Sequence, residues 1–344
     1  MQGTAMRTYI IRRCLQSFIV FGAILIIVFS MLQITGNPAA VLMPLDSTEE
    51  DIQAFSKEMG FDQPIPIQFA KFMLGSDLVD DLLGADREKV KVDELERDPD
   101  APKIVRTKGV IRGDFGFSYR HEIPAMGLVL EHFPNTVLLA LAAVLIAVVI
   151  SIPAGVLSAT FRNTWIDYSS SVGAMFGQSM PNFWLGLLLI IFFAVYLGWL
   201  PTSGFDAWYY IVLPAITAGL YATARITRLV RSQMLDVLGM DYVRTARSKG
   251  IVEWIVVVRH ALKNASIPVV TLVGFELGIL LGGTVVTEAV FAWPGVGFLV
   301  VDAINNQDYP IVQAAVALLA FVFVFVNLVV DILYAWLDPR ISYS

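Results

Sequence analysis

Long apolar blocks constrain this chain more than any other feature of its sequence. A bilayer core about 30 Å thick is crossed by about 20 helical residues, at a rise of about 1.5 Å per residue. Residues 14–35 alone offer 22 residues without a charge. Five further blocks bring the prediction to six transmembrane helices, at residues 14–35, 133–161, 168–198, 209–231, 265–291 and 311–337. We therefore expect an all-α integral membrane protein.

The composition supports this class. Hydrophobic residues make up 56% of the 344 residues and charged residues only 16%, whereas soluble domains contain about 25% charged residues. These values exclude a soluble enzyme, a disordered chain and a nucleic-acid binder. The first apolar block follows three arginines, as a secretory signal does, but it exceeds the apolar region of about 7–15 residues of such signals, so we interpret it as a retained anchor. The single cysteine, Cys14, excludes an intrachain disulfide.

Basic residues predict the orientation, because Lys and Arg gather in cytoplasmic loops. Outside residues 35–131 the chain contains 13 of them. With six spans and a cytoplasmic N-terminus, all 13 fall on one side, and the opposite loops 202–208 and 292–310 contain none. The predicted cytoplasmic parts are both termini, including residues 1–13, and the loops 162–167 and 225–264.

The segment 36–131 is then extracytoplasmic. Long loops cross the membrane largely regardless of charge, so the 19 acidic and 11 basic residues of 35–131 do not oppose this placement. Half of residues 75–108 are charged, 10 acidic and 7 basic. We interpret 75–108 as a solvated insertion that is helical around residues 78–83, disordered elsewhere, and contributes little apolar burial.

Motifs of catalysis are missing. The sequence contains no G-x-x-x-x-G-K-[ST] phosphate loop and no H-E-x-x-H zinc motif, so we expect no ATP hydrolysis and no metal site in this chain. Gly177-Gln178-Ser179 is faintly similar to the serine motif of intramembrane proteases. That chemistry needs a histidine as base in a facing span, and the predicted topology places none at membrane depth. Small residues that pack helices explain this motif better.

The cytoplasmic loop 239–264 contains a short amphipathic pattern. Asp241 can cap a helix and Gly250 can end it. Tyr242, Val243 and Ala246 form an apolar face, and basic residues form the remainder. Such a helix lies on a membrane surface or fills a groove on a soluble partner. The alternative is a basic loop that only obeys the orientation rule.

The fifth predicted span contains a carboxylate at membrane depth. Gly274, Gly278 and Gly282 recur every four residues and predict a close-packing ridge. Glu276 lies about 160–200° from this ridge, at about 100° per residue, on a face with Val269, Gly283 and Thr287. It either lines a solute path with Gly283 and Thr287 or is hydrogen-bonded in a helix interface. Glu288 and Asp331 lie near the ends of predicted spans, where we expect them to be at the membrane–water interface.

The residue order of the cytoplasmic loop then suggests a family. The loop contains Asp241-Tyr242-Val243-Arg244-Thr245-Ala246-Arg247-Ser248-Lys249-Gly250, followed by His260-Ala261-Leu262-Lys263-Asn264-Ala265 and Pro268. It resembles the cytoplasmic loop of permease subunits of bacterial ATP-binding-cassette (ABC) importers, more narrowly the first permease of dipeptide and oligopeptide systems. The general family loop reads Glu-Ala-Ala-x-x-x-Gly; here Arg244 replaces the Glu and Thr245 the first Ala.

Other segments extend the resemblance over nearly the whole chain, with the exception of residues 75–108. They are Tyr9-Ile10-Ile11-Arg12-Arg13, Gly60-Phe61-Asp62-Gln63-Pro64, Gly113-Asp114-Phe115-Gly116-Phe117-Ser118, Ser179-Met180-Pro181, Leu213-Pro214-Ala215, Thr287-Glu288-Ala289-Val290-Phe291-Ala292-Trp293-Pro294-Gly295, Asp308-Tyr309-Pro310 and Asp338-Pro339-Arg340.

The resemblance implies a type I ABC importer permease fold with a permease core at residues 132–344, in the bacterial inner membrane. Its implied partners are a second, homologous permease subunit, two ABC ATPase subunits and an extracytoplasmic solute-binding protein. ATP and Mg would be bound by the ATPases, so this chain would hold no cofactor and would not be an enzyme. The implied ATPase-coupling residues are Asp241, Tyr242, Arg244, Thr245, Ala246, Lys249, Gly250 and His260.

The resemblance implies import of di- or oligopeptides by alternating access. The same subgroup also serves nickel chelates and oligosaccharides, so the solute stays open. An ion-coupled secondary carrier is the alternative of another class. Such carriers usually contain internal repeats, and we find none in this sequence.

Overall fold

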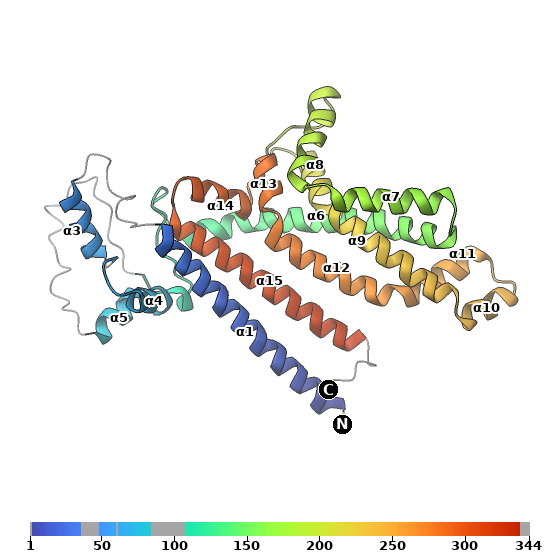
Figure 1. Ribbon diagram of the computed structural model, residues 1–344, viewed down its shortest axis with the longest axis horizontal. Coiled ribbons are helices and arrows are strands. Elements are labelled where there is room, and N and C mark those ends of the chain that lie inside the picture. The colour runs from blue at the N-terminus through green and yellow to red at the C-terminus, as the bar shows by residue number, and fades with distance from the viewer. Residues whose placement is uncertain (1, 36–47, 60, 84–106, 338–344) are drawn as a thin grey trace. The chain divides into compact units, whose positions relative to one another are not determined.

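The computed structural model describes residues 2–35, 48–59, 61–83 and 107–337 (Figure 1). These residues form helices and no β-strand, apart from one isolated bridge between Phe117 and Pro124. The α-helices are α1 (Gln2–Thr35), α3 (Glu49–Met59), α4 (Ile65–Leu74), α5 (Ser76–Leu82), α6 (Ala125–Thr160), α7 (Trp165–Ser179), α8 (Asn182–Leu189), α9 (Val212–Leu238), α10 (Asp241–Ser248), α11 (Glu253–Ile255), α12 (Lys263–Gly283), α13 (Val285–Phe291), α14 (Val296–Asn305) and α15 (Tyr309–Leu337). Short 3₁₀ or π segments are η2 (Val110–Arg112), η3 (Ile190–Tyr196), η4 (Trp208–Ile211) and η5 (Val256–Leu262).

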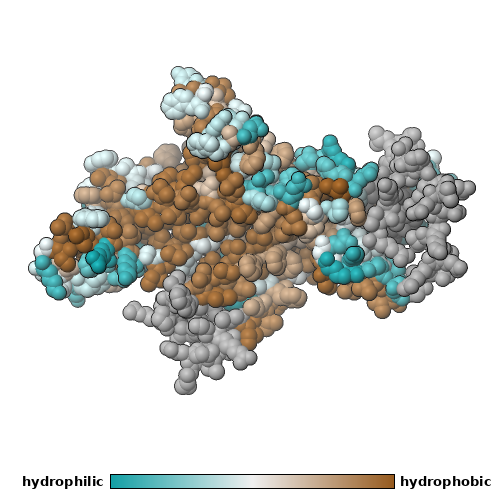
Figure 2. All heavy atoms as spheres, turned by 180° about the vertical axis from the view of Figure 1, so that it is seen from behind, coloured by the Kyte–Doolittle hydropathy of each residue, from teal (hydrophilic) through white to brown (hydrophobic). Residues whose placement is uncertain are grey.

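Among the described residues, four helices are long and apolar enough to cross a membrane, and two bent pairs bring the number to at most six. The four are Ile11–Ser30, Ala125–Thr160, Glu253–Gly283 and Tyr309–Leu333. The pair α7 and α8–η3 is bent by 107°, and the pair α13 and α14 by 79°. Figure 2 shows hydrophobic residues over much of the long helices on the displayed face. The all-α membrane class predicted from the sequence is thus confirmed.

Helix α9 departs from the predicted span 209–231. It runs unbroken from Val212 to Leu238, beyond the predicted end. Three arginines, Arg225, Arg228 and Arg231, interrupt its apolar sequence, and it is not among the apolar spans. One face of α9 is nonetheless buried along its whole length, from Leu213 to Val237. The helix therefore serves as a packing centre, and this burial rather than lipid contact explains its small residues.

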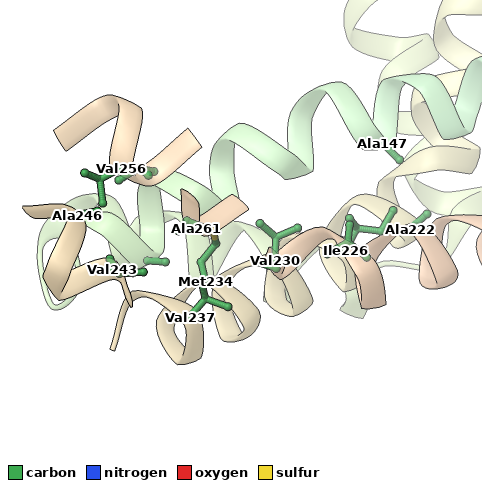
Figure 3. Close-up of a cluster of buried hydrophobic side chains, with 14 residues drawn as sticks. Ala147, Ala222, Ile226, Val230, Met234, Val237, Val243, Ala246, Val256 and Ala261 are labelled. Atoms are coloured by element: carbon green, nitrogen blue, oxygen red, sulfur yellow. The ribbon is translucent and has the colours of Figure 1, made fainter. Parts of the chain in front are cut away.

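The chain divides into two compact units. The first comprises residues 1–21, 134–298 and 319–344, and α9 lies beside α7 and α12 in it. A buried cluster runs along this unit from Ala147 and Ala222 to Val256 and Ala261 (Figure 3). Very close approaches support it: a Cβ added to Gly155 of α6 would lie 2.6 Å from Val230 Cβ. Small residues here allow helix backbones to approach closely.

The glycine ridge of α12 packs as predicted. A Cβ on Gly274 would lie 2.7 Å from Val330 Cγ2, and one on Gly278 would lie 3.4 Å from Val326 Cγ1. Both partners belong to α15, so the ridge is the contact surface for the last helix. The prediction of close packing is confirmed for these two glycines, whereas Gly282 has looser contacts at 3.8 Å.

The second unit comprises residues 22–133 and 299–318. Phe29, Phe69, Phe72 and Phe115 form a chain of aromatic contacts in it, with ring centroids 5.2–6.4 Å apart. The buried carboxylate of Asp308 accepts hydrogen bonds from the Ser118 hydroxyl and from the backbone N–H groups of residues 119 and 120. Residues 113–118 and 308–310, which both belong to the family resemblance, are therefore connected by hydrogen bonds within this unit.

The two ends of the insertion 75–108 lie against each other, and we call the contact around Gly75 and Gly109 the neck. A Cβ on Gly109 would collide with the backbone nitrogen of Gly75, so the two backbones touch where only glycine fits. The Thr107 N–H donates to Ser76 Oγ (3.1 Å), and Arg112 pairs with Asp77. The predicted helix near residues 78–83 is present as α5, but its Val79 is buried against the neighbouring structure. The expectation that 75–108 contributes little apolar burial is therefore wrong for Val79, whereas Leu78, Leu82 and Leu83 are exposed as expected. Residues 84–106 lie outside the described residues, as does the segment 338–340.

We predict that residues 84–106 can be replaced by a flexible linker of about six residues, which spans roughly 13 Å. The assembled complex should keep its thermal midpoint, because the neck and α5 remain. Removing residues 76–107 instead also removes Val79 and the Arg112–Asp77 pair, and should lower the midpoint. Midpoints of the purified complexes in nanodiscs check this, and an equal decrease in both deletions would contradict it.

Candidate coupling surface and translocation path

Helix α10 is the short amphipathic helix that the sequence predicts. It begins at Asp241 and ends at Ser248, two residues before the predicted end. Gly250 has φ +75°, the left-handed conformation that favours glycine, so its predicted role in ending the helix is confirmed. The capping role of Asp241 is wrong. Met240 occupies the N-cap position without a side-chain hydrogen bond, and Asp241 follows it as the first helical residue. Its carboxylate is 98% exposed and lies 3.7 Å from Arg244.

The apolar face of α10 packs inside this chain. Val243 and Ala246 are buried in the same cluster as Val256 and Ala261 of η5 (Figure 3). The sequence suggested that Ala246 lies against a partner, where a bulky side chain cannot fit. That expectation is wrong, because the small side chain of Ala246 is required by the packing of its own chain. The residues of α10 and its end that remain exposed are Asp241, Tyr242, Arg244, Thr245, Arg247, Ser248, Lys249 and Gly250.

Polar contacts close the loop onto η5 and α12. The Asn264 amide donates to the Tyr242 hydroxyl (2.7 Å), and that hydroxyl lies 3.4 Å from the His260 carbonyl oxygen. The Arg247 guanidinium pairs with Glu253 at 2.7 Å, and this contact raises the pKa of Arg247. The structure thus brings Tyr242 and His260 together, while Arg244, Thr245 and Lys249 stay on the exposed side of α10. Six of the predicted coupling residues form one exposed surface on this support, whereas Ala246 is buried and His260 is half-buried.

Glu276 does not occupy an open position on a path. Its side chain is 2% exposed, and its Oε1 lies 3.0 Å from Nη1 of Arg225 on α9. The sequence analysis counts Arg225 among the basic cytoplasmic residues and leaves two alternatives for Glu276, a solute path or a helix interface. The contact with Arg225 of α9 supports the interface. A buried charge is tolerated when it is paired, and this pair explains Glu276.

The face that was expected to join Glu276, Gly283 and Thr287 is interrupted. Helix α12 ends at Gly283, and α13 begins at Val285 after a break at Thr284. Gly283 is exposed, whereas Thr287 and Glu276 are buried. Since the helical rotation restarts at the break, the three residues do not share one continuous helix face.

Glu288, which the sequence predicts near the membrane–water interface, is a structural residue inside the protein. It is fully buried. The Thr284 hydroxyl donates to Oε1 (2.9 Å), and the N–H groups of Gly297 and Phe298 donate to Oε2 (2.7 and 3.1 Å). These N–H groups belong to the first turn of α14, where helices have unpaired donors. The carboxylate therefore caps α14 and fixes the bend after α13. The signal in the sequence was a glutamate followed by two nearby glycines, Gly295 and Gly297.

Asp331, the other carboxylate expected at an interface, pairs with Arg13 of α1 at 3.3 Å, with 31% of its side chain exposed. Among the described residues no group of three or more His, Cys, Asp or Glu side chains could hold a metal ion.

Comparison with known proteins identifies the family of this chain. Residues 151–343 match the family described as "Binding-protein-dependent transport system inner membrane component". Residues 6–87 match the family described as "Binding-prot-dependent transport system membrane comp, N-term". The chain belongs to this family of inner-membrane permease subunits of ABC importers. The resemblance inferred from the cytoplasmic loop is thereby confirmed, and an ion-coupled secondary carrier is no longer needed as an alternative.

Curated relatives support the family, and a solved structure supports the fold. The chain is 36% identical over 340 residues to the "Glutathione transport system permease protein GsiC" of Escherichia coli strain K12, covering 98% of this chain and 100% of the relative. The same values hold for GsiC of Shigella dysenteriae serotype 1. A solved structure of the MetNI methionine ABC transporter in an inward-facing conformation has a TM-score of 0.51 at 20% identity, covering 62% of this chain and 97% of that one. This likeness confirms the type I importer permease fold.

Family membership carries three plain consequences. The protein is a membrane-embedded permease subunit of an ABC importer. ATP hydrolysis in such systems belongs to separate subunits. Partner ATPases and a solute-binding protein are implied, and the family description itself names the binding protein.

Proposed function

We propose that this chain forms half of the translocation path of an importer of peptide-like solutes and is driven through α10. One observation carries the coupling role. Buried Val243 and Ala246 fix α10 in the chain's own core, while Arg244, Thr245 and Lys249 are left exposed. A rigidly held helix with an exposed polar face can transmit a push to the helices behind it, since packed cores do not deform continuously. The π-helical segment η5, which supports α10, leads directly into α12.

The proposed assembly contains this chain, a second homologous permease, two ATPase subunits and one extracytoplasmic binding protein. Both termini, loop 162–167 and residues 239–264 lie in the cytoplasm, supported by the ten of the 13 basic residues that these segments contain. ATP and Mg bind to the ATPases, and this chain holds no cofactor. Closure of the ATPases on ATP moves the coupling surface, and the path alternates between inward and outward access.

The solute class rests on relatives. Two curated relatives of nearly full-length similarity are named as permeases of a glutathione transport system, and glutathione is a peptide. We therefore place peptide-like solutes first, ahead of oligosaccharides and nickel chelates. Purification of the cognate binding protein with its natural ligand tests this assignment directly, and a carbohydrate or a metal chelate in its site would contradict it.

We predict that Arg244→Glu with Lys249→Glu lowers solute-stimulated ATP hydrolysis by about tenfold or more, because charge reversal at an interface removes attraction and adds repulsion. The folded chain should be unaffected, since both residues are exposed. The measurement is ATPase activity of the reconstituted complex together with the amount of ATPase that co-purifies.

Arg162→Glu provides the matched control, because Arg162 is exposed on the other predicted cytoplasmic loop and lies outside α10. It should change activity less than the double variant. Ala246→Trp is unsuitable as a coupling test, because it would disturb the chain's own core. Full activity of the Arg244→Glu, Lys249→Glu complex would count against α10 as the coupling surface.

A further inference from the structure

Arg225 is a cation whose surroundings use only part of its hydrogen-bonding capacity. It is the central residue of α9, 13 residues from each end. Its Nη1 lies 3.0 Å from Glu276 Oε1. The geometry is an ionic contact and not an aligned hydrogen bond, because the same Oε1 has no hydrogen-bond partner among the described atoms. A guanidinium carries five N–H donors, so donors remain available.

Aromatic side chains flank this guanidinium. The Arg225 Cζ atom lies 5.9 Å from the ring centroids of Tyr221 and of Phe275. Both aromatic residues are exposed, at 37% and 38%, and the Arg225 side chain is 29% exposed. Rings at this distance attract the cation and restrict its position. The Arg225 guanidinium is therefore partly exposed and lies near two aromatic rings, whereas its partner Glu276 is buried.

The exposed part of Arg225 has to face water or a polar group. Arg225 lies at the overlap of the predicted span 209–231 and the predicted cytoplasmic loop 225–264. An arginine within a span is unfavourable against lipid, and such residues usually face a bundle interior or a water-filled cavity. Glu276 is too deeply buried to touch a solute, so its role is to hold Arg225 in place and to offset part of its charge. A planar guanidinium matches the two oxygens of a carboxylate.

We propose that Arg225 binds the carboxylate of the solute in the translocation path, with Glu276 as its positioning residue. This proposal rests on the proposed function, because it places Arg225 on the path of an importer of peptide-like solutes. The solute class is narrowed to peptides with a free C-terminal carboxylate. Binding stays weak because Glu276 offsets the cation, and weak binding is what permits release. In this proposal Arg225, and not Glu276, contacts the solute.

The test compares a tripeptide with its C-terminal amide in proteoliposomes that contain the whole importer and its binding protein. For each variant, the uptake of the tripeptide (the acid) and of its amide is divided by the uptake of the same solute through the unchanged complex. The acid-to-amide ratio is the quotient of these two values, so the preference of the binding protein cancels. Arg225→Gln should lower the acid-to-amide ratio about tenfold, as expected when charge-assisted hydrogen bonds are removed. Arg225→Lys should give an intermediate ratio, because it keeps the charge without the planar fork.

Arg228→Gln is the matched control, since it removes an exposed arginine from the same helix. Its acid-to-amide ratio should stay within about twofold of the unchanged complex, well below the change expected when a charge-assisted hydrogen bond to the solute is removed. If Arg225→Gln fails to assemble, the double variant Arg225→Gln, Glu276→Gln supplies a neutral pair. In that background the acid-to-amide ratio should be about tenfold lower than in the unchanged complex, because the guanidinium that binds the carboxylate is absent.

Equal loss of acid and amide uptake in Arg225→Gln would overturn the proposal and leave a structural ion pair. Unchanged uptake of both peptides would overturn the proposal as well. So would a solved complex in which an acidic residue of the second permease or a lipid phosphate is bound to Arg225. A wild-type importer that takes up neither peptide would instead overturn the proposed solute class, and the carboxylate site with it.

Discussion

Glu288→Ala should be one of the most destabilising single substitutions in this permease, with a loss of about 3–5 kcal/mol in the free energy of unfolding. The residue is fully buried. Alanine removes the acceptor for the Thr284 hydroxyl and for two backbone N–H groups at the start of α14. Those donors would be left without partners in a buried position, which costs more than the hydrogen bonds themselves contribute. The measurement is the thermal midpoint of the purified complex, followed by tryptophan fluorescence.

Two comparisons make this prediction specific. Glu288→Gln keeps an acceptor oxygen and should lose much less stability than Glu288→Ala. Glu131→Ala removes an exposed glutamate and should be close to neutral. Space around the carboxylate gives an independent variant: a Cβ on Gly295 would collide with Glu288 Oε2, so Gly295→Ala should reproduce part of the loss. A Glu288→Ala protein as stable as Glu131→Ala would show that the cap does not hold the α13–α14 bend.

The class of fold could be predicted because apolar length is a local property. Each block in the sequence reports its own ability to cross a bilayer, and no knowledge of neighbours is needed. The glycine ridge of α12 was predictable for the same reason, since spacing alone defines a helix face. The break between α7 and α8 consists of Met180 and Pro181, and the pair bends there by 107°. Pro153 and Pro268, by contrast, lie inside continuous helices, so proline alone did not locate the bends.

The partners of charged residues could not be predicted. Arg225 and Arg231 both counted as basic residues of a cytoplasmic region, yet each is paired with a carboxylate from a different helix. Such pairings depend on which helix faces lie together, and one sequence contains no direct signal of that. The same limit explains Ala246. Its place in an amphipathic pattern indicated an apolar contact, but the pattern did not say whether the contact lies within the chain or with a partner.

Arg231→Met should cause the second large loss, about 3–4 kcal/mol. Arg231 on α9 donates twice to Asp167 at the start of α7, from Nε (2.6 Å) and Nη2 (2.8 Å). Asp167 also accepts from the Ser158 hydroxyl of α6 (2.6 Å) and from the Asn163 N–H (3.0 Å). The Asp167 side chain is 5% exposed, so removal of the arginine leaves a buried charge with neutral donors only. The junction of three helices should loosen, which the thermal midpoint of the purified complex will report.

A double-mutant cycle separates the pair from the bulk of the side chain. Asp167→Asn with Arg231→Gln replaces two charges by two amides that can still hydrogen-bond, so it should lose less than the sum of the two single substitutions. Arg228→Met controls for removal of an arginine one turn earlier on α9, where the side chain is exposed, and should be nearly neutral. Additive losses in the cycle would mean that the bidentate contact contributes little. Strong coupling would show that the contact between Asp167 and Arg231 holds α6, α7 and α9 together. Movement of α10 would then be transmitted to all three helices at once.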